Sequence, residues 1–151
     1  MLRLSRKTLF AIEAVLDIAY NAGPEPVQSR EITRRQNIPR RYLEQVLQQL
    51  VREGLLSGVR GPRGGYRLAR ERRRISVGDI VSVVRSMETA DDPLSDATGS
   101  ELGMSVVRPL WQDMQDDMMK RLSDVSIDDL CNNAHKIGIE SEGRENLDFS
   151  I

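Results

Sequence analysis

The stretch RYLEQVLQQLVREGLLSGVRGPRGGYRLAR, residues 41–70, decides the fold because it joins two different periodicities. Its first part repeats apolar residues every three or four positions, which predicts an amphipathic helix from about residue 40 to residue 53, closed by Gly54. The expected buried face of that helix consists of Leu43, Val46, Leu47 and Leu50. Its second part, LLSGVR and YRLAR on either side of a glycine-rich loop, predicts a two-stranded hairpin.

Two further helices are expected upstream of this stretch. Residues 7–21 have apolar side chains at helical spacing and precede the helix-ending pair Gly23-Pro24. The expected apolar stripe is formed by Leu9, Ile12, Leu16 and Ala19, widened by Phe10 and Val15. A short helix is expected from Ser29, as its N-cap, to about Gln36. Two helices joined by a tight turn and followed by a hairpin predict a winged helix-turn-helix.

The loop GPRGGY, residues 61–66, has two competing interpretations. Phosphate-binding and dinucleotide-binding loops require G-x-x-x-x-G-K-[ST] or G-x-G-x-x-G before a helix, and this loop matches neither pattern. A hairpin tip suits it better, because glycine permits positive φ and close approach to another surface, while proline stiffens the turn. The residues with these properties are Gly61, Pro62, Gly64 and Gly65. Arg60 and Arg63 would supply charge to a DNA groove or to phosphates, although a charged surface hairpin also fits the loop alone.

The chain changes character after residue 87. Residues 75–87 predict one more helix, with Ser76 as its cap and an inward face of Ile80, Val83, Val84 and Met87. Residues 88–103 lack apolar periodicity and are rich in turn formers, which predicts a mobile loop.

A long helical pattern extends from about residue 101 to residue 135. Its apolar stripe consists of Val107, Leu110 or Trp111, Met114, Met118, Leu122 and Val125. Pro109 marks either the start of its straight part or a kink, and Ser126 is a candidate cap for a further helical segment. The polar tail after Gly138 is expected to fray.

The charge is divided between the two halves of the chain. Residues 1–85 carry 17 Lys and Arg against 8 Asp and Glu, a net of +9, while residues 86–151 carry 5 against 15, a net of −10. This asymmetry indicates a basic module for nucleic acid with an acidic remainder. Glu13 and Asp17 interrupt the N-terminal apolar stretch, which argues against a signal peptide or a membrane span. The single cysteine, Cys131, cannot form an intrachain disulfide and favours the cytoplasm.

The second helix of a helix-turn-helix reads base edges with its N-terminal turns. Arginine suits guanine, glutamine suits adenine and glutamate accepts from cytosine. The residues expected to contact DNA are Arg3, Lys7, Ser29, Arg40, Arg41, Tyr42, Glu44, Gln45, Arg60, Gly61, Pro62, Arg63, Gly64, Gly65 and Tyr66. Packing in a half-buried position is an equal alternative for Tyr42. Arg34 and Arg35 are expected to be phosphate anchors or solvated charges rather than base readers.

Residues 41–70, together with the opening LSRKTLFAIEAVLDIA and the later RPLWQDM and RLSDVSIDDL, resemble the Rrf2 family of bacterial regulators, the IscR/NsrR/RirA/CymR-like group. The resemblance covers nearly the whole chain and implies a homodimeric winged-helix repressor or activator whose long helix crosses its partner. Iron–sulfur members carry three cysteines between the wing domain and the long helix, whereas residues 88–103 contain none. The resemblance therefore implies the clusterless branch, which responds to protein partners, thiol chemistry or small ligands, and no cofactor is expected.

Two features of the C-terminal half have alternatives. Cys131 and His135 are four residues apart, so a dimer would gather two of each, enough for zinc. The alternative is a buried thiol and an exposed cation at the helix end. The apolar stripe predicts dimer packing, with a cofactor box as the minor alternative, because such a stripe is a liability on a monomer. The residues expected to form the dimer are Leu110, Trp111, Met114, Met118 and Leu122.

The sequence thus predicts a mainly α protein: a winged helix-turn-helix with a two-stranded β wing plus a long C-terminal dimerisation helix. The expected parts are a DNA-binding domain (1–87), the loop (88–103), the dimerisation helix and following segment (104–138) and a tail (139–151). The expected function is sequence-specific regulation, as a cytoplasmic homodimeric repressor on double-stranded DNA with a pseudo-palindromic operator. No membrane contact is expected, and the effector is expected to be an unknown protein or small molecule, if the chain has one. A winged-helix module for protein or RNA is the alternative, and the lack of catalytic motifs argues against an enzyme.

Overall fold

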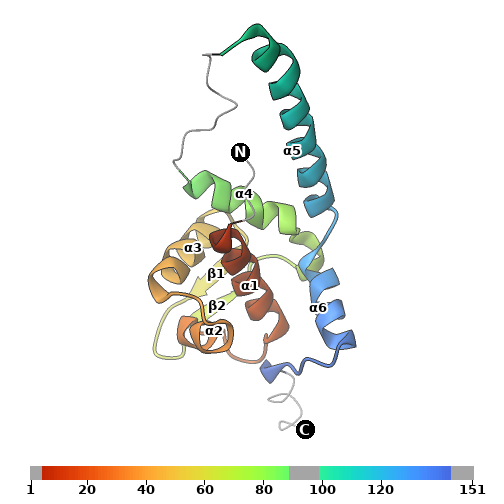
Figure 1. Cartoon of the computed structure of the whole chain (residues 1–151). Helices are drawn as coiled ribbons and strands as arrows, with labels where there is room; N and C mark the ends of the chain where they lie inside the picture. The colour runs from red at the N-terminus through yellow and green to blue at the C-terminus, as the bar shows by residue number, and fades with distance from the viewer. Residues whose placement is uncertain (1–4, 89–98, 144–151) are drawn as a thin grey trace.

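The computed structural model of the chain describes residues 5–88 and 99–143. Figure 1 shows a bundle of helices around a small hairpin, with one helix rising away from the bundle and a last helix returning beside its first. The elements are α1 (Arg6–Tyr20), α2 (Ser29–Gln36), α3 (Arg40–Arg52), β1 (Leu56–Val59), β2 (Gly65–Leu68), the 3-10 helix η1 (Arg72–Arg74), α4 (Val77–Met87), the π-helical turn η2 (Gly103–Val107), α5 (Arg108–Ser123) and α6 (Ile127–Lys136). The predicted winged helix-turn-helix with additional C-terminal helices is confirmed. None of the helices in these two ranges has both the length and the apolar character needed to cross a bilayer.

Helix α1 is the centre of the core and contacts α2, α3, α4, α6 and β2. The buried face predicted for α3 is confirmed, since its four apolar residues are all fully buried. The stripe predicted for α1 is displaced, however, because Leu9 is 43% exposed. Of the predicted residues, Val15 and Ala19 are buried, and the buried face of α1 also carries Ala11 and Ala14, which were not predicted. Small alanine side chains allow neighbouring helices to approach α1 closely, which explains why the core selects this face.

The helix starts follow capping chemistry. Ser76 accepts from the backbone N–H of Asp79 at 2.9 Å and caps α4 as predicted. Ser29, in contrast, is the first residue of α2 and not its N-cap. The N-cap is Gln28, whose backbone N–H donates to the Glu31 carboxylate at 2.8 Å. The helix therefore begins one residue earlier than predicted, and only Gln28 separates it from Val27, which is paired with the wing.

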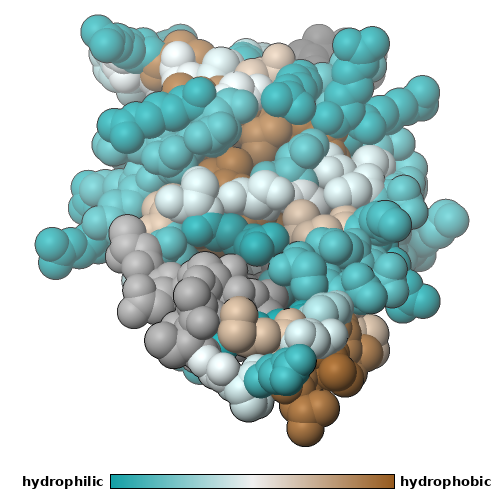
Figure 2. Space-filling model, turned by 90° about the horizontal axis from the view of Figure 1, so that it is seen from above, coloured by the Kyte–Doolittle hydropathy of each residue, from teal (hydrophilic) through white to brown (hydrophobic). Residues whose placement is uncertain are grey.

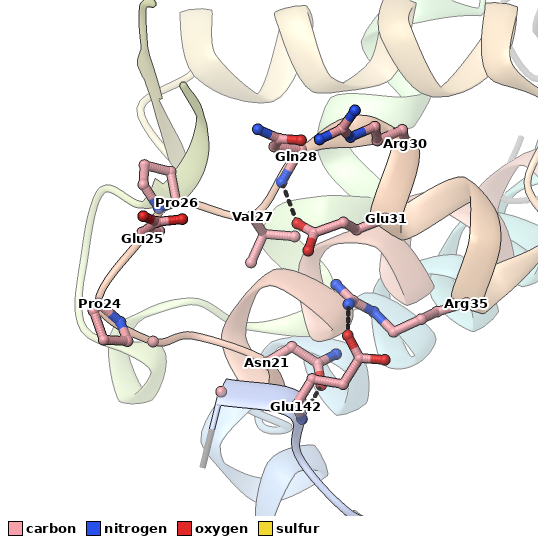
Figure 3. A pocket seen from close by; sticks show the side chains of 12 residues that line it. Asn21, Pro24, Glu25, Pro26, Val27, Gln28, Arg30, Glu31, Arg35 and Glu142 are labelled. Atoms are coloured by element: carbon pink, nitrogen blue, oxygen red, sulfur yellow. Dashed lines mark hydrogen bonds and ion pairs between the residues drawn. The ribbon is translucent and has the colours of Figure 1, made fainter. Parts of the chain in front are cut away.

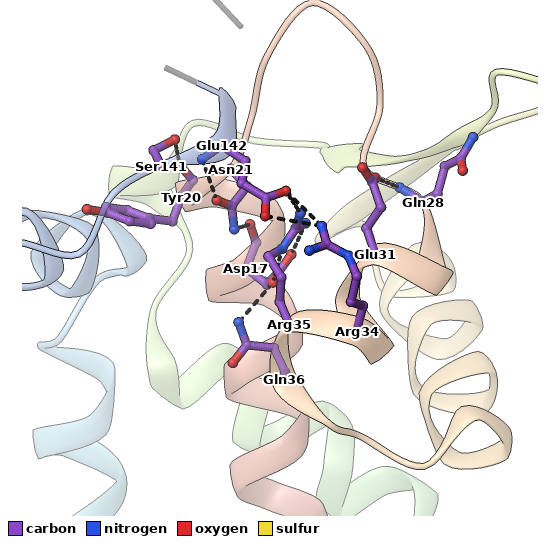
Figure 4. A network of polar contacts seen from close by, with 10 residues as sticks. All are labelled: Asp17, Tyr20, Asn21, Gln28, Glu31, Arg34, Arg35, Gln36, Ser141 and Glu142. Atoms are coloured by element: carbon purple, nitrogen blue, oxygen red, sulfur yellow. Dashed lines mark hydrogen bonds and ion pairs between the residues drawn. The ribbon is translucent and has the colours of Figure 1, made fainter. Parts of the chain in front are cut away.

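A buried ion pair joins α1 to α2 (Figure 4). The Asp17 side chain is 0% exposed, and both its oxygens accept from Arg35, at 2.8 Å each. Gln36 donates a further hydrogen bond to Asp17 at 2.9 Å. The hydrogen bond to Asp17 raises the pKa of Arg35 above its usual value, although burial acts in the opposite direction. Arg35 is therefore a structural cation of the core, and the prediction that it is a phosphate anchor or a solvated charge is wrong.

The chain is already helical before Pro109, but the regular α-helix α5 begins at Arg108 with Pro109 in its first turn, so Pro109 marks the start of the straight part, the first of the two predicted alternatives. Proline has no N–H to donate to a preceding carbonyl. The preceding turn is widened accordingly, and Arg108 donates five residues back to Gly103 in the π-helical turn. The helical pattern predicted to reach residue 135 breaks after Ser123, and Ser126 caps α6 as predicted.

We expect Asp17→Asn to destabilise the fold by about 3 kcal/mol, because it leaves the buried Arg35 guanidinium without its main counter-charge. Urea unfolding followed by circular dichroism measures the change. Glu44→Gln is the matched control, since it breaks the exposed Arg40–Glu44 pair and is expected to cost less than about 1 kcal/mol. Equal effects of the two substitutions would contradict a structural role for the Asp17 pair.

Candidate nucleic-acid interface

The first two turns of α3 present polar side chains to solvent. Arg40, Arg41, Glu44 and Gln45 are all exposed, while the opposite face of the helix is buried in the core. Arg40 Nε lies 3.1 Å from Glu44 Oε1, which restrains the guanidinium along the helix surface. These four predicted base readers therefore share one accessible helix surface.

Tyr42 differs from these four residues because it packs against α1. It is half-buried, and its hydroxyl donates to the backbone oxygen of Lys7 at 2.6 Å. Its ring centroid lies 6.2 Å from that of Phe10, and the exposed Lys7 ammonium lies 5.9 Å from the same ring. Burial raises the pKa of Tyr42 to about 12, so the hydroxyl remains a donor at neutral pH. The geometry favours packing over base reading, the two alternatives that the sequence left open for Tyr42.

The wing is a hairpin whose base is paired with a third segment of chain. Leu56 pairs with Leu68 and Val59 with Gly65 in the antiparallel register. Val27, before α2, exchanges two backbone hydrogen bonds with Tyr66, at 3.0 and 2.8 Å. The half-buried Tyr66 thus belongs to the base of the wing, which is tied to the start of α2.

Two wing glycines are needed for contacts within the chain itself. A Cβ on Gly65 would lie 2.4 Å from the Val27 carbonyl oxygen, and one on Gly64 would lie 2.2 Å from that of Val59. Of the three glycines predicted to permit positive φ, only Gly61 has it, at +111°. The close approach that Gly64 and Gly65 allow is therefore to the protein's own backbone.

The tip of the wing presents its charge to solvent. Arg60, Pro62 and Arg63 are exposed, and Arg63 Nη1 lies 3.7 Å from the carboxylate of Glu25, a long contact for an ion pair. The loop that carries them and the start of α3 lie toward the same side of the molecule in Figure 1. Arg3, also predicted to contact DNA, lies outside the described residues. Arg67, which the sequence analysis did not single out, donates to the carbonyl oxygens of Gly23 and Pro24 and holds β2 on the α1–α2 loop.

Helix α5 leaves apolar side chains uncovered in the single chain. Figure 2 shows hydrophobic side chains gathered at one edge of the molecule, where α5 begins. Leu110 and Met114 are 60% and 59% exposed, and Trp111 and Met118 are exposed as well. Leu122 is half-buried, on the side of α5 that also carries the buried Gln115. The stripe predicted for dimerisation is thus accessible except at its Leu122 end.

The predicted metal candidates do not share an environment. Cys131 is 2% exposed and belongs to the core, whereas His135 is exposed. Among the residues that the structure describes, no group of three or more His, Cys, Asp or Glu side chains is arranged to hold a metal ion. Burial raises the pKa of the Cys131 thiol, against the opposing charge of Arg72. The arrangement is that of a protonated core thiol.

Part of the tail that was predicted to fray is packed against the DNA-binding domain. Ser141 and Gly143 are buried, and the Glu142 carboxylate reaches the arginines of α2. The prediction failed because neither a serine nor a glycine carries an apolar signal of burial. The contacts are to backbone atoms and charges far away in the chain, which periodicity does not reveal.

The chain is similar to known transcriptional regulators. Residues 4–133 match the model of the Rrf2 family, described as an iron-dependent transcriptional regulator. The HTH-type transcriptional regulator IscR of Escherichia coli K12 is 34% identical over 140 residues, which cover 91% of this chain and 85% of that protein. The solved structure of T. potens IscR superposes with a TM-score of 0.73 at 30% identity and covers 93% of both chains. CymR, the global cysteine regulator of B. subtilis, gives 0.69 at 28% identity over 88% of this chain and 98% of its own.

The residues of this chain do not fit an iron–sulfur cluster held by three cysteines. The whole sequence contains one cysteine and one histidine, and neither lies between the wing domain and α5. Cys131 is also enclosed by the core, where a cluster could not reach it without opening α6. The donor set that a three-cysteine cluster requires is absent from the sequence itself.

We expect Cys131 to react with iodoacetamide at least about tenfold more slowly in the native protein than in urea, because the thiolate is the nucleophile and burial disfavours it. Mass spectrometry of the alkylated chain over time measures both rates, and the single cysteine makes the product unambiguous. Equal rates in the two conditions would contradict the buried, protonated thiol.

Proposed function

The chain belongs to the Rrf2 family, and from this premise we propose that it is a homodimeric repressor that recognises one pseudo-palindromic operator without a three-cysteine cluster. The family consists of DNA-binding transcriptional regulators, not enzymes. The compartment proposed for its action is the bacterial cytoplasm, where the duplex is found.

The observation that carries the proposal is the pairing of two exposed elements. The start of α3 presents Arg40, Arg41 and Gln45 to solvent, and the wing presents Arg60. A helix of this kind enters the major groove with its N-terminal turns. Arginine at a hairpin tip suits a narrow minor groove, whose negative potential attracts it. The surplus of basic residues in the first 85 positions adds attraction that does not depend on sequence.

The exposed stripe of α5 supports the homodimer. Four large apolar side chains in a row on a rising helix exceed what a monomer usually leaves in water. A second copy would cover them and bring two recognition helices to half-sites about 34 Å apart, one turn of the duplex. The acidic C-terminal half would then lie away from the phosphates.

The signal is proposed to be an unidentified protein or small molecule. A cluster lacks its cysteine ligands, and thiol oxidation fits poorly with a cysteine that is buried and protonated. Selection of bound sites from random duplexes identifies the operator, and its repetition with oxidised protein tests the thiol route. A winged-helix module for protein or RNA would show no affinity even for random duplex DNA at low salt.

We expect Arg60→Ala to weaken operator binding by about 1–3 kcal/mol, because it removes a charged donor from the wing tip. Fluorescence anisotropy with the selected operator measures the change at fixed salt. Arg52→Ala removes the same charge from the other end of α3 and is the control that leaves affinity nearly unchanged. Equal losses in both variants would indicate a general charge effect and would contradict the wing assignment.

We expect Met114→Glu to convert a dimer into a monomer at micromolar concentration, because it places a charge in the middle of the apolar stripe. Light scattering measures the mass. Gln112→Glu adds the same charge at an exposed polar position of α5 and is expected to leave the dimer intact. A monomeric wild-type protein, or a dimeric Met114→Glu variant, would refute this interface.

A further inference from the structure

The chain beyond α6 crosses back onto the DNA-binding domain (Figures 1 and 4). Residues 139–143, the C-terminal strap, run along the end of α1. Ser141 Oγ donates to the backbone oxygen of Tyr20 at 2.6 Å, and the N–H of Glu142 donates to Asn21 Oδ1 at 3.0 Å. The Tyr20 hydroxyl donates to the backbone oxygen of Ile139. The strap is thus bound to the C-terminal end of α1 by hydrogen bonds.

The strap also fits the α1–α2 loop sterically. A Cβ on Gly143 would lie 2.1 Å from the Ala22 carbonyl oxygen and 2.7 Å from that of Asn21. These neighbours are backbone atoms, which cannot move aside as a flexible side chain can. Only glycine permits the observed approach at position 143, so the strap and the loop are in direct backbone contact.

Glu142 connects the strap to the first helix of the helix-turn-helix (Figure 4). Its carboxylate accepts from Arg34 Nη2 at 3.0 and 3.1 Å and from Arg35 Nη1 at 2.5 Å. Partial burial acts to raise the pKa of Glu142, but the hydrogen bonds and charges of the two arginines lower it below the usual glutamate value. The carboxylate is therefore ionised at neutral pH. Because Arg35 also holds Asp17, one guanidinium joins the strap, α2 and α1.

Helix α2 depends on such polar contacts because its apolar anchoring is slight. Ile32 is its one buried residue. A cleft of about 440 Å³ lies between the strap, the α1–α2 loop and the first turn of α2, so this side of the helix is not packed (Figure 3). A three-residue turn, residues 37–39, connects α2 to α3. Helix α2 is thus joined to α3 by a short connection, and the two helices also pack against each other.

We propose that the C-terminal strap is a positioning element for DNA recognition, in which Glu142 and Gly143 set the angle of α2 and, through it, of α3. The proposal rests on the DNA-binding function proposed above. Neither residue is expected to contact DNA. The strap follows α6 in the chain, so it also connects the C-terminal helices to the helix-turn-helix.

Two variants with different chemistry test this role. Glu142→Gln removes the carboxylate charge, and Gly143→Ala forces the strap away from the loop without changing any charge. We expect each to weaken operator binding about fivefold and to leave affinity for random duplex within twofold, because only specific contacts depend on the angle of α3. Glu140→Gln, an equal charge change at an exposed strap position, is the control and is expected to affect neither affinity.

The ratio of operator to random-duplex affinity is the decisive readout, measured at 25 °C where circular dichroism shows every variant folded. A purely stabilising strap would lower the unfolding midpoint of both variants and leave this ratio unchanged, which would overturn the proposal. Tighter binding of Glu142→Gln to both duplexes would show charge repulsion instead and would also overturn it. A wild-type protein that prefers no duplex would refute the proposed function, whereas a discriminating wild type with unchanged variants would refute the strap's role alone.

Discussion

The carboxylate of Asp17 holds α2, the first helix of the helix-turn-helix, against α1. Its side chain is fully buried, and the cost of its desolvation is offset by a bidentate ion pair with Arg35 and a hydrogen bond from Gln36. Both partners come from α2, which has little apolar surface of its own to bury. The directional hydrogen bonds of this pair restrict the orientation of α2, and the contact of the same Arg35 with Glu142 adds to that restriction.

The wing, like α2, is held in place by polar contacts, here backbone hydrogen bonds to Val27. Its two short strands would not be stable alone, and Val27 completes them as a third pairing partner. The absence of a side chain at Gly65 lets the two backbones approach. The wing and α2 are therefore connected by the single residue Gln28, so that two parts of the proposed DNA-binding surface share one base. Rigid placement of both lowers the entropy lost on binding.

Much of the helical architecture could be predicted from the sequence, because apolar spacing and capping residues are local features of the chain. The spacing of apolar residues located α3, and the serine caps located the starts of α4 and α6. The failures occurred where a distant partner decides the outcome. Arg35 resembles any basic residue before a recognition helix until Asp17 is known to lie opposite. Leu9 fits a helical stripe, yet the neighbouring helices select the alanine face of α1. Nothing in the sequence around Gly143 predicts its close contact with the Ala22 backbone, because only the fold brings the two together.

The return of the strap to α1 has a consequence for the order in which the molecule is assembled. Tyr20 and Ser141, like Asn21 and Glu142, are 121 positions apart. Closing so long a loop requires most of the intervening chain to be in place, so this contact forms late. During synthesis, the helix-turn-helix leaves the ribosome before the strap does, so the contacts between them form only after the last segment has been made. A prematurely terminated chain would lack that segment and, with it, the contacts of Glu142 with α2 and of Gly143 with the α1–α2 loop.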